Sequence, residues 1–167
     1  MSWLVLTGYM GAGKSTGGRM IADAAGAEFA DSDALIEQQA GLPIPRIFAT
    51  KGELWFRRME ERVIRDLVAR EPQGVLSIGG GAVESEKTRN LLGRVADVVY
   101  LEADPAVLWA RVSGSGRPLA TDEARFNRRF ARRAALYEGL ADLTVDATAP
   151  DQEAVARDVA AWWRGRG

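Results

Sequence analysis

One short segment near the start of the chain constrains its fold more than any other. Residues 8–15 read GYMGAGKS and satisfy the pattern GxxxxGK followed by Ser or Thr. They lie between an apolar run at 3–7 that predicts a buried strand and a pattern at 14–25 that predicts a helix. Glycines let such a loop bend so that successive N–H groups point at phosphate oxygens, and the helix N-terminus adds partial positive charge. With this composition a chance match is expected about 0.003 times, so a glycine-rich turn beside a surface lysine is the weaker alternative.

The loop and the first helical turn carry the residues expected to bind a nucleoside triphosphate. Lys14 would neutralise the β- and γ-phosphates, and the Ser15 hydroxyl would bind Mg²⁺. Thr16 follows in the first turn, close to the α-phosphate. The motif therefore predicts the phosphate donor and leaves the acceptor open.

Short apolar runs alternate with helical patterns along the rest of the chain. Strands are expected at 3–7, 28–30, 75–78, 98–101 and 143–145. Helices are expected at 14–25, 33–39, from about 45, 53–70, from 104, 122–138 and 150–163. This alternation of buried-type strands with helices indicates a parallel sheet covered on both faces. We expect a single α/β domain over 1–167, with a five-stranded parallel sheet between two layers of helices.

The composition excludes several classes of chemistry. The chain has no histidine and no cysteine, which excludes Ser-His-Asp triads, His-ligated zinc, thiolate chemistry and disulfides. Proton transfer must therefore use a carboxylate, a lysine, a tyrosine or water. A net charge of −1 argues against nucleic acid as a partner, and no apolar run is long enough to span a membrane. We expect a cytoplasmic protein.

Two aspartates follow the second expected strand. Asp31 and Asp33 flank Ser32 at the carboxyl end of that strand, where doubly wound sheets bind ligands. One carboxylate could hold a Mg²⁺-bound water while the other orients an acceptor hydroxyl. The alternative is an N-cap for the helix that begins near residue 34. Beside the phosphate loop, the functional interpretation is favoured.

Arginines and glycines suggest the rest of an acceptor site. Arg57 and Arg58 lie near a helix N-terminus, where the helix dipole disfavours cations. Either Glu53 and Glu61, four residues away from Arg57 on each side, or a substrate carboxylate could compensate. Residues 79–81 are three glycines at the end of the third strand, where they would expose backbone N–H groups to a ligand.

Arginines are concentrated between residues 111 and 133. This segment holds seven arginines and two acidic residues. Residues 125, 129 and 133 recur at helical spacing and predict a basic face, while Phe126, Phe130 and Tyr137 predict a separate apolar face. The sequence SGSG at 113–116 predicts a hinge for a mobile lid that excludes water from a triphosphate. A solvated basic face and an RNA-binding patch are the alternatives.

In this order, these segments resemble the shikimate kinase family, whose members have a P-loop fold like that of the nucleoside monophosphate kinases. The resemblance covers nearly the whole chain. Its motifs are GYMGAGKST at 8–16, Asp31 with Asp33, the stretch 44–60 that contains IF, GE and FR, GGGA at 79–82, RPL at 117–119, and RRAALY at 132–137. It implies a kinase that transfers the γ-phosphoryl group of ATP to the 3-hydroxyl of shikimate with Mg²⁺, in the biosynthesis of chorismate and the aromatic amino acids.

The resemblance also implies a role for each matching residue. Asp33 would bind the acceptor hydroxyl and act as the base, Arg57 and Arg133 would bind the substrate carboxylate, and Asp31 would hold water on Mg²⁺. The shikimate site would include Asp33, Arg57, Gly79, Gly80, Gly81 and Arg133. The ATP site would include Gly11, Ala12, Gly13, Lys14, Ser15, Thr16, Arg111 and Arg117. Arg117, in a lid at about 112–124, would stabilise the transferring phosphoryl group, and Arg111 would lie against adenine. The shikimate-binding segment would be about 31–60.

Three residues depart from the family pattern, and none of them carries a reactive group. Ala120 replaces a leucine, Ala135 a proline, and Gly17 a branched apolar residue, so they affect the expected lid packing and stability. A kinase of another polyol acid such as gluconate, and a nucleotide-binding module without turnover, are the rival interpretations. We expect a monomer that takes only small-molecule substrates.

Overall fold

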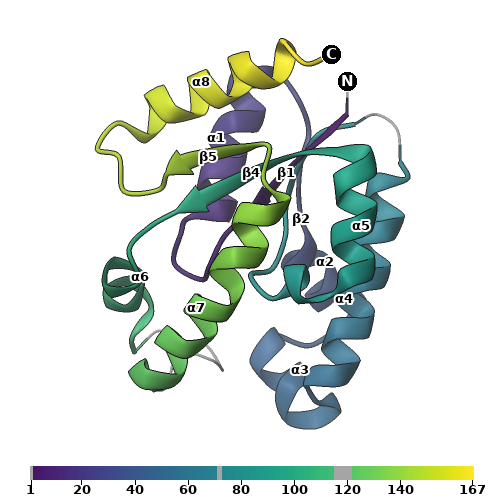
Figure 1. Ribbon diagram of the computed structural model, residues 1–167. Helices are drawn as coiled ribbons and strands as arrows, with labels where there is room; N and C mark the ends of the chain where they lie inside the picture. Colours follow the sequence, from purple (N-terminus) through teal and green to yellow (C-terminus); the bar gives the residue numbers. More distant parts are fainter. Residues whose placement is uncertain (1, 71–72, 115–121) are drawn as a thin grey trace.

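The computed structural model describes residues 2–70, 73–114 and 122–167, and Figure 1 shows their arrangement. These residues form a sheet of five strands in the order β2-β3-β1-β4-β5, and every neighbouring pair is parallel. The strands are β1 (Trp3–Thr7), β2 (Phe29–Asp31), β3 (Val75–Ser77), β4 (Ala96–Glu102) and β5 (Leu143–Asp146). The predicted five-stranded parallel sheet is confirmed.

Helices cover both faces of this sheet. They are α1 (Lys14–Ala25), α2 (Ser32–Ala40), α3 (Ile44–Lys51), α4 (Glu53–Val68), α5 (Glu86–Val95), α6 (Pro105–Val112), α7 (Glu123–Leu140) and α8 (Gln152–Arg164), with a short 3-10 helix η1 (Ala82–Glu84). α1 and α8 lie side by side on one face, and α4, α5 and α7 cover the other (Figure 1). Within the described ranges, no helix is both long and apolar enough to cross a membrane.

The central strand explains why both helical layers are needed. All five residues of β1 are buried, and Val5 pairs in register with Leu76 of β3 and Val98 of β4. A strand that is apolar on both sides is stable only when helices exclude water from both faces. The same layering brings α1 against the sheet at Gly18, where a Cβ would lie 2.4 Å from the Phe29 ring.

The sequence patterns did not predict η1 and α5. Only Thr88 and Leu92 of α5 are buried. A helix with so small a buried face needs few apolar residues, so its sequence pattern is weak. A capping signal is present, since the Ser85 hydroxyl accepts a hydrogen bond from the N–H of Thr88 at 3.2 Å. The connection from β3 to the parallel strand β4 also requires a crossover, which is usually a helix.

The topology gathers three loops at one edge of the sheet. The loop at 8–13 follows β1, Asp31 ends β2, and the glycines at 79–81 follow β3 closely. Because the carboxyl ends of parallel strands share an edge, these loops are neighbours although they are far apart in sequence. Beyond this edge α2, α3 and α4 pack against one another as a small helical group (Figure 1).

Candidate active site

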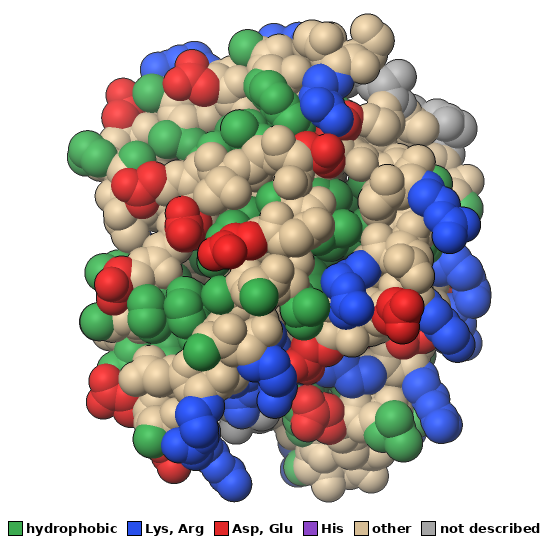
Figure 2. All heavy atoms as spheres, viewed as in Figure 1, with side chains coloured by type: hydrophobic (Ala, Val, Ile, Leu, Met, Phe, Trp, Pro, Cys, Tyr) green, Lys and Arg blue, Asp and Glu red, His purple; other side chains and the backbone are tan. Residues whose placement is uncertain are grey.

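A cavity of about 640 Å³ lies at the carboxyl edge of the sheet. Its walls come from the phosphate loop and α1, the end of β2, the α2–α4 group, the three glycines after β3, and α7. Figure 2 shows a notch in the lower part of this face, with basic and acidic side chains on both sides of it. Segments from residue 10 to residue 133 thus contribute to one site.

The loop after β1 has the backbone geometry that its glycines predict. Gly11 and Gly13 have φ values of +87° and +84°, which residues with a side chain rarely adopt. The Lys14 ammonium group folds over the loop and donates to the carbonyl oxygens of Gly8 at 2.8 Å and Tyr9 at 3.2 Å. α1 has no side-chain N-cap. Its N-terminal N–H groups are therefore suited to an anion.

Arg111 contacts this loop from α6. Its Nη1 donates to the carbonyl oxygen of Gly11 at 2.9 Å. Gly11 itself has no room for a side chain, since a Cβ there would lie 2.9 Å from Cγ1 of Val112. The end of α6 therefore lies against the loop that would hold the phosphates.

Asp31 serves two functions with its two carboxylate oxygens. Oδ1 accepts the N–H groups of Asp33 at 2.9 Å and Ala34 at 3.2 Å and so caps α2, which confirms the structural interpretation of this aspartate. Oδ2 accepts a hydrogen bond from the Ser15 hydroxyl at 2.5 Å. The two interpretations of Asp31 are compatible, because capping occupies one oxygen and the other faces the phosphate loop.

Ser15 and Asp31 offer oxygen ligands to a divalent cation at this edge. Hydroxyl and carboxylate oxygens suit Mg²⁺, which usually takes one or two protein ligands and completes its shell with water and phosphate oxygens. Among the described residues, no group of three or more acidic side chains could form a separate metal site. The donor set fits Mg²⁺ that arrives with a nucleotide.

The carboxylates of half-buried Asp33 and buried Glu60 meet at Gly79, each with one oxygen away from solvent. A Cβ on Gly79 would lie 2.5 Å from Glu60 Oε2 and 2.9 Å from Asp33 Oδ1. Neither oxygen has a hydrogen-bond partner among the described residues. The Gly79 N–H donates to the Ser32 hydroxyl at 3.2 Å, which ties the glycine loop to the start of α2.

Burial raises the pKa of both acids. The pKa of Asp33 lies above its ordinary value because the side chain is buried and the charge of Asp31 is nearby, although Lys14 and Arg57 oppose the shift. Burial raises the pKa of Glu60 to about 7, despite the attraction of Arg57. A carboxylate with a raised pKa is a better proton acceptor, so this pair is suited to acid–base chemistry.

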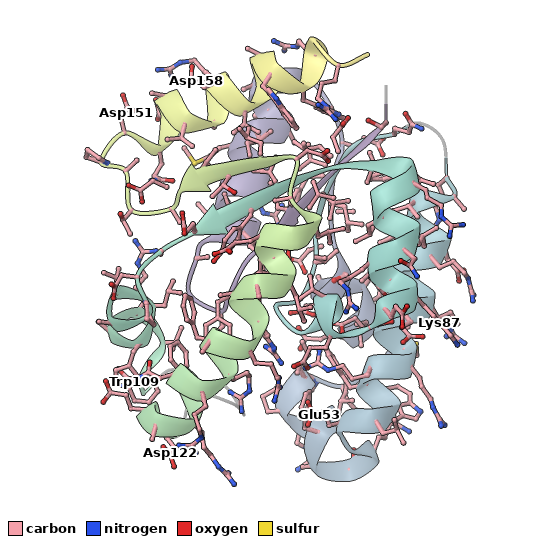
Figure 3. The ribbon with its side chains drawn as sticks, in the orientation of Figure 1. Glu53, Lys87, Trp109, Asp122, Asp151 and Asp158 are labelled. Carbon is pink, nitrogen blue, oxygen red and sulfur yellow. The ribbon has the colours of Figure 1, made fainter. Side chains whose placement is uncertain are left out.

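Arg57 lies across the glycine loop. A Cβ on Gly81 would lie 2.4 Å from Nη2 of Arg57, so only glycine allows this contact. Nη1 donates to Glu60 at 2.9 Å, and Nη2 is 3.5 Å from Glu53, which Figure 3 labels near the start of α4. The expected pairing with Glu53 is confirmed, but the C-terminal partner is Glu60 rather than Glu61. The Arg57 side chain turns toward the cavity, which Glu60 also lines. Arg57 therefore pairs with the buried glutamate three residues later in the sequence, and not with the one four residues later.

Arg133 joins the site from α7. Its side chain is 2% exposed, and its Nη2 lies 3.3 Å from Oε2 of Glu84. The predicted separation of faces is wrong for this residue, because Arg133 is buried like Phe126 and Tyr137 while Arg125 is exposed. At α-helical spacing, position 133 falls seven residues after Phe126, so it continues the buried stripe.

Arg57 and Arg133 each have one N–H donor without a hydrogen-bond partner among the described residues. The Nε atoms of Arg57 and Arg133 are buried and have no hydrogen-bond partner among the described residues, and both side chains line the cavity. A buried N–H without a partner is costly. Two such donors in one cavity therefore favour an anionic ligand.

The expected lid falls largely outside the described residues. Arg117 lies there, as do the other residues of 115–121. The described flanks are the end of α6 and the start of α7, where Asp122 caps the helix by accepting the N–H of Arg125 at 3.1 Å. Trp109 of α6, labelled in Figure 3, packs against Phe126 of α7 with ring centroids 5.2 Å apart.

The sequence patterns missed Glu60, Glu84 and the aromatic wall of the cavity. Glu60 could have been found from its position three residues after Arg57 on a helix. Phe48 and Phe56 line the cavity with ring centroids 5.0 Å apart. Glu84 left no local signal, since its partners lie 48 and 49 residues away.

Comparison with known proteins points to one family. A family model described as shikimate kinase matches residues 10–164. A shikimate kinase of Halorhodospira halophila is 43% identical over 162 residues, which cover 95% of this chain and 91% of that protein. One of Mycobacterium marinum is 45% identical over 157 residues, which cover 92% of this chain and 84% of that protein.

Solved structures agree with the sequence relatives. Shikimate kinase from Acinetobacter baumannii in complex with shikimate has a TM-score of 0.92 and 32% identity, and the match covers 99% of this chain and 94% of that one. A gluconokinase from Sinorhizobium meliloti has a TM-score of 0.59 at 18% identity, covering 99% and 92%. The likeness to the gluconokinase shows a shared fold alone.

Proposed function

The chain belongs to the shikimate kinase family, and we propose that its cavity transfers the γ-phosphoryl group of ATP to the 3-hydroxyl of shikimate. One observation carries this assignment of substrate. The cavity that the phosphate loop lines is also lined by two arginines with unpartnered Nε donors and by Asp33, whose Oδ1 has no partner among the described residues. Shikimate has a carboxylate for the arginines and a ring hydroxyl for the aspartate, and Phe48 and Phe56 supply an apolar wall for its ring.

Asp33 is the proposed general base. Its raised pKa and unpartnered Oδ1 support accepting the proton of the 3-hydroxyl as the hydroxyl oxygen attacks the γ-phosphorus. The bond between the γ-phosphorus and its bridging oxygen breaks, and ADP leaves with that oxygen. Proton transfer supplies part of the acceleration, and positioning and electrostatics supply the rest.

The carboxylate of shikimate would lie between Arg57 and Arg133. Both guanidinium groups line the cavity, and guanidinium groups bind carboxylates through paired hydrogen bonds. Residues 79–81 line the same cavity, and a Cβ at Gly79 would collide with Glu60 and Asp33, and one at Gly81 with Arg57. This arrangement supports an acceptor held by its acid group, with a hydroxyl presented to Asp33.

The phosphate loop is the proposed nucleotide site. Its N–H groups, Lys14 and Thr16 would bind the phosphates, and Arg111, already against the loop, would lie beside adenine. Ser15 and, through water, Asp31 would hold Mg²⁺, which when bound neutralises phosphate charge. Arg117 would stabilise the transferring group from a lid at about 112–124 that excludes water.

The active unit is proposed to be a monomer in the cytoplasm. The phosphate loop, Asp33, Arg57 and Arg133 all line this one cavity, so each proposed substrate group has a partner without a residue from a second subunit. A net charge of −1 supports small-molecule substrates rather than nucleic acid.

Substitution of Asp33 tests the proposed base. Asp33→Asn keeps the side-chain shape and should lower kcat by about 10²- to 10⁴-fold, while the Kd for ATP stays unchanged. Asp158→Asn, an exposed change on α8 (Figure 3), is the matched control. Steady-state turnover and nucleotide binding measure the two effects. Unchanged turnover of Asp33→Asn would remove Asp33 from the chemistry.

A further inference from the structure

Glu84, at the end of η1, joins two adjacent arginines of α7. Its Oε1 accepts hydrogen bonds from Arg132, at 2.9 Å from Nε and 2.5 Å from Nη2. Its Oε2 lies 3.3 Å from Nη2 of Arg133. One carboxylate thus divides its oxygens between an exposed arginine and a buried one.

The three side chains differ in their access to solvent and to the cavity. Arg132 is 65% exposed, Glu84 27% and Arg133 2%. Arg133 lines the cavity, whereas Glu84 and Arg132 do not. Glu84 therefore holds the buried guanidinium from outside the cavity wall and does not occupy the place of a ligand.

The charge of Glu84 is retained at neutral pH. Partial burial acts to raise its pKa, but the charges and hydrogen bonds of Arg133 and Arg132 outweigh this and lower it. The buried Arg133 thus has a permanent counter-charge before any ligand binds. Without one, a buried cation is strongly destabilised.

Arg57, which lies against Gly81 of the glycine loop, is held in a similar way. Glu60 binds its Nη1 at 2.9 Å, and its Nε has no partner among the described residues, as for Arg133. Gly81, which lies directly against Arg57, is also the N-cap residue of the 3-10 helix that ends at Glu84. One short segment, 79–84, therefore sets the positions of both arginines.

We propose that Glu84 is a positioning residue for substrate binding, which acts through Arg133. Held in place by Arg132, Glu84 fixes the Arg133 guanidinium so that its Nε–H, which has no partner among the described residues, binds the substrate carboxylate. The proposal rests on the function proposed above, because it needs the acceptor to be a carboxylic acid held by Arg133. It assigns Arg132 a part as well, since Arg132 orients the Glu84 carboxylate.

Substitution at position 84 should affect substrate binding more than turnover. Glu84→Gln keeps the size but has one acceptor oxygen for two arginines, and Glu84→Ala removes both contacts. We expect KM for shikimate to rise about tenfold or more, with kcat and KM for ATP changed little. Glu86→Gln, an exposed glutamate two residues away, is the matched control and should leave all three constants unchanged.

A ligand without the acid group separates positioning from a general structural effect. Shikimate and its carboxamide, which has a similar shape without the charge, are each titrated into wild type and Glu84→Gln, and the four Kd values form a cycle. If Glu84 acts through Arg133 on the carboxylate, the substitution raises the Kd for shikimate about tenfold and leaves the Kd for the carboxamide almost unchanged.

Each other result overturns the inference. Equal weakening of both ligands, or a fall in thermal stability without a change in KM, would make Glu84 a structural residue only. Tighter binding of shikimate by Glu84→Gln would mean that Glu84 competes with the ligand. Wild-type turnover that does not respond to shikimate would instead overturn the proposed function.

Discussion

At the scale of single residues, the site depends on charges that lie close together and away from water. Glu60 is buried, Asp33 is half-buried with its Oδ1 away from solvent, and both border Gly79, so the charge of Asp33 adds to the cost of ionising Glu60. Arg57 offsets this cost for Glu60 through an ion pair, but burial has the larger effect on its pKa. The apo site therefore binds protons more tightly than an unfolded chain does.

This difference predicts the pH dependence of stability. The pKa of Glu60 is about 7 in the folded chain and 4.5 ordinarily, so between these values the folded state binds more protons than the unfolded state. The free energy of unfolding should fall as the pH rises through this interval. Glu60→Gln should flatten that part of the curve, measured by urea denaturation from pH 4.5 to pH 8. Glu61→Gln is the control, and an unchanged slope in Glu60→Gln would contradict the assignment.

Arg57 gives the second prediction at this scale. Arg57→Lys keeps the charge but loses the planar pair of donors. We expect KM for shikimate to rise by at least about tenfold, with a smaller change in kcat, in steady-state assays. Arg58→Lys, an exposed neighbour, should behave as wild type. An unaltered KM in Arg57→Lys would place the carboxylate elsewhere.

A site residue could be predicted from the sequence when its partners lie within a few residues of it in the chain. Lys14, Ser15 and the capping by Asp31 follow from patterns within a few residues, and the structure has the predicted loop and cap. To predict Glu60 as the partner of Arg57, one must know the direction in which the Arg57 side chain turns. To predict Glu84 as the partner of Arg133, one must know how η1 packs on α7. The local spacing left both Glu60 and Glu61 within reach of Arg57, and no local pattern encodes Glu84.

At the scale of elements, close approaches of the backbone determine where helices and strands can pack. Gly74 precedes β3, and a Cβ there would lie 2.6 Å from the carbonyl oxygen of Glu28. That oxygen accepts the Val75 N–H at 2.8 Å, so it cannot move without loss of the pairing between β2 and β3. The strand that carries the glycine loop thus depends on this small residue.

Two glycine substitutions should therefore have opposite effects on stability. Gly74→Ala forces a collision with backbone and should cost about 1–3 kcal/mol. Gly93→Ala is exposed within α5 and has nothing nearer than Leu140 at 4.0 Å, so it should stabilise by up to about 1 kcal/mol. Thermal unfolding measures the Tm of each variant against wild type. Equal shifts in Tm for the two variants would contradict the packing argument.

The elements themselves were largely predictable because their periodicities are local. The strands and the helix at 14–25 have apolar patterns that match the structure to within a few residues. α5 was missed because its buried face is small. The face assignment of α7 failed at Arg133, since charge suggested exposure while helical spacing placed it in the buried stripe.

At the scale of the whole molecule, the topology turns distant segments into one site. The central position of β1 puts the phosphate loop between the end of β3 and α6, and α7 brings Arg133 across to the glycine loop. Two tyrosines tie these parts together. The Tyr9 hydroxyl donates to Phe126 at 2.9 Å, and that of Tyr137 donates to Gly80 at 2.5 Å. Donor and acceptor sites therefore share one framework.

If this framework phosphorylates shikimate, the release of ADP must depend on shikimate as the acceptor. The protein is assayed with Mg-ATP and shikimate, gluconate, a nucleoside monophosphate or no acceptor. We expect shikimate alone to stimulate turnover, with one shikimate 3-phosphate formed per ADP. Stimulation by gluconate or a nucleotide instead, or tight ATP binding without any acceptor-dependent release of ADP, would show that shikimate is not the acceptor.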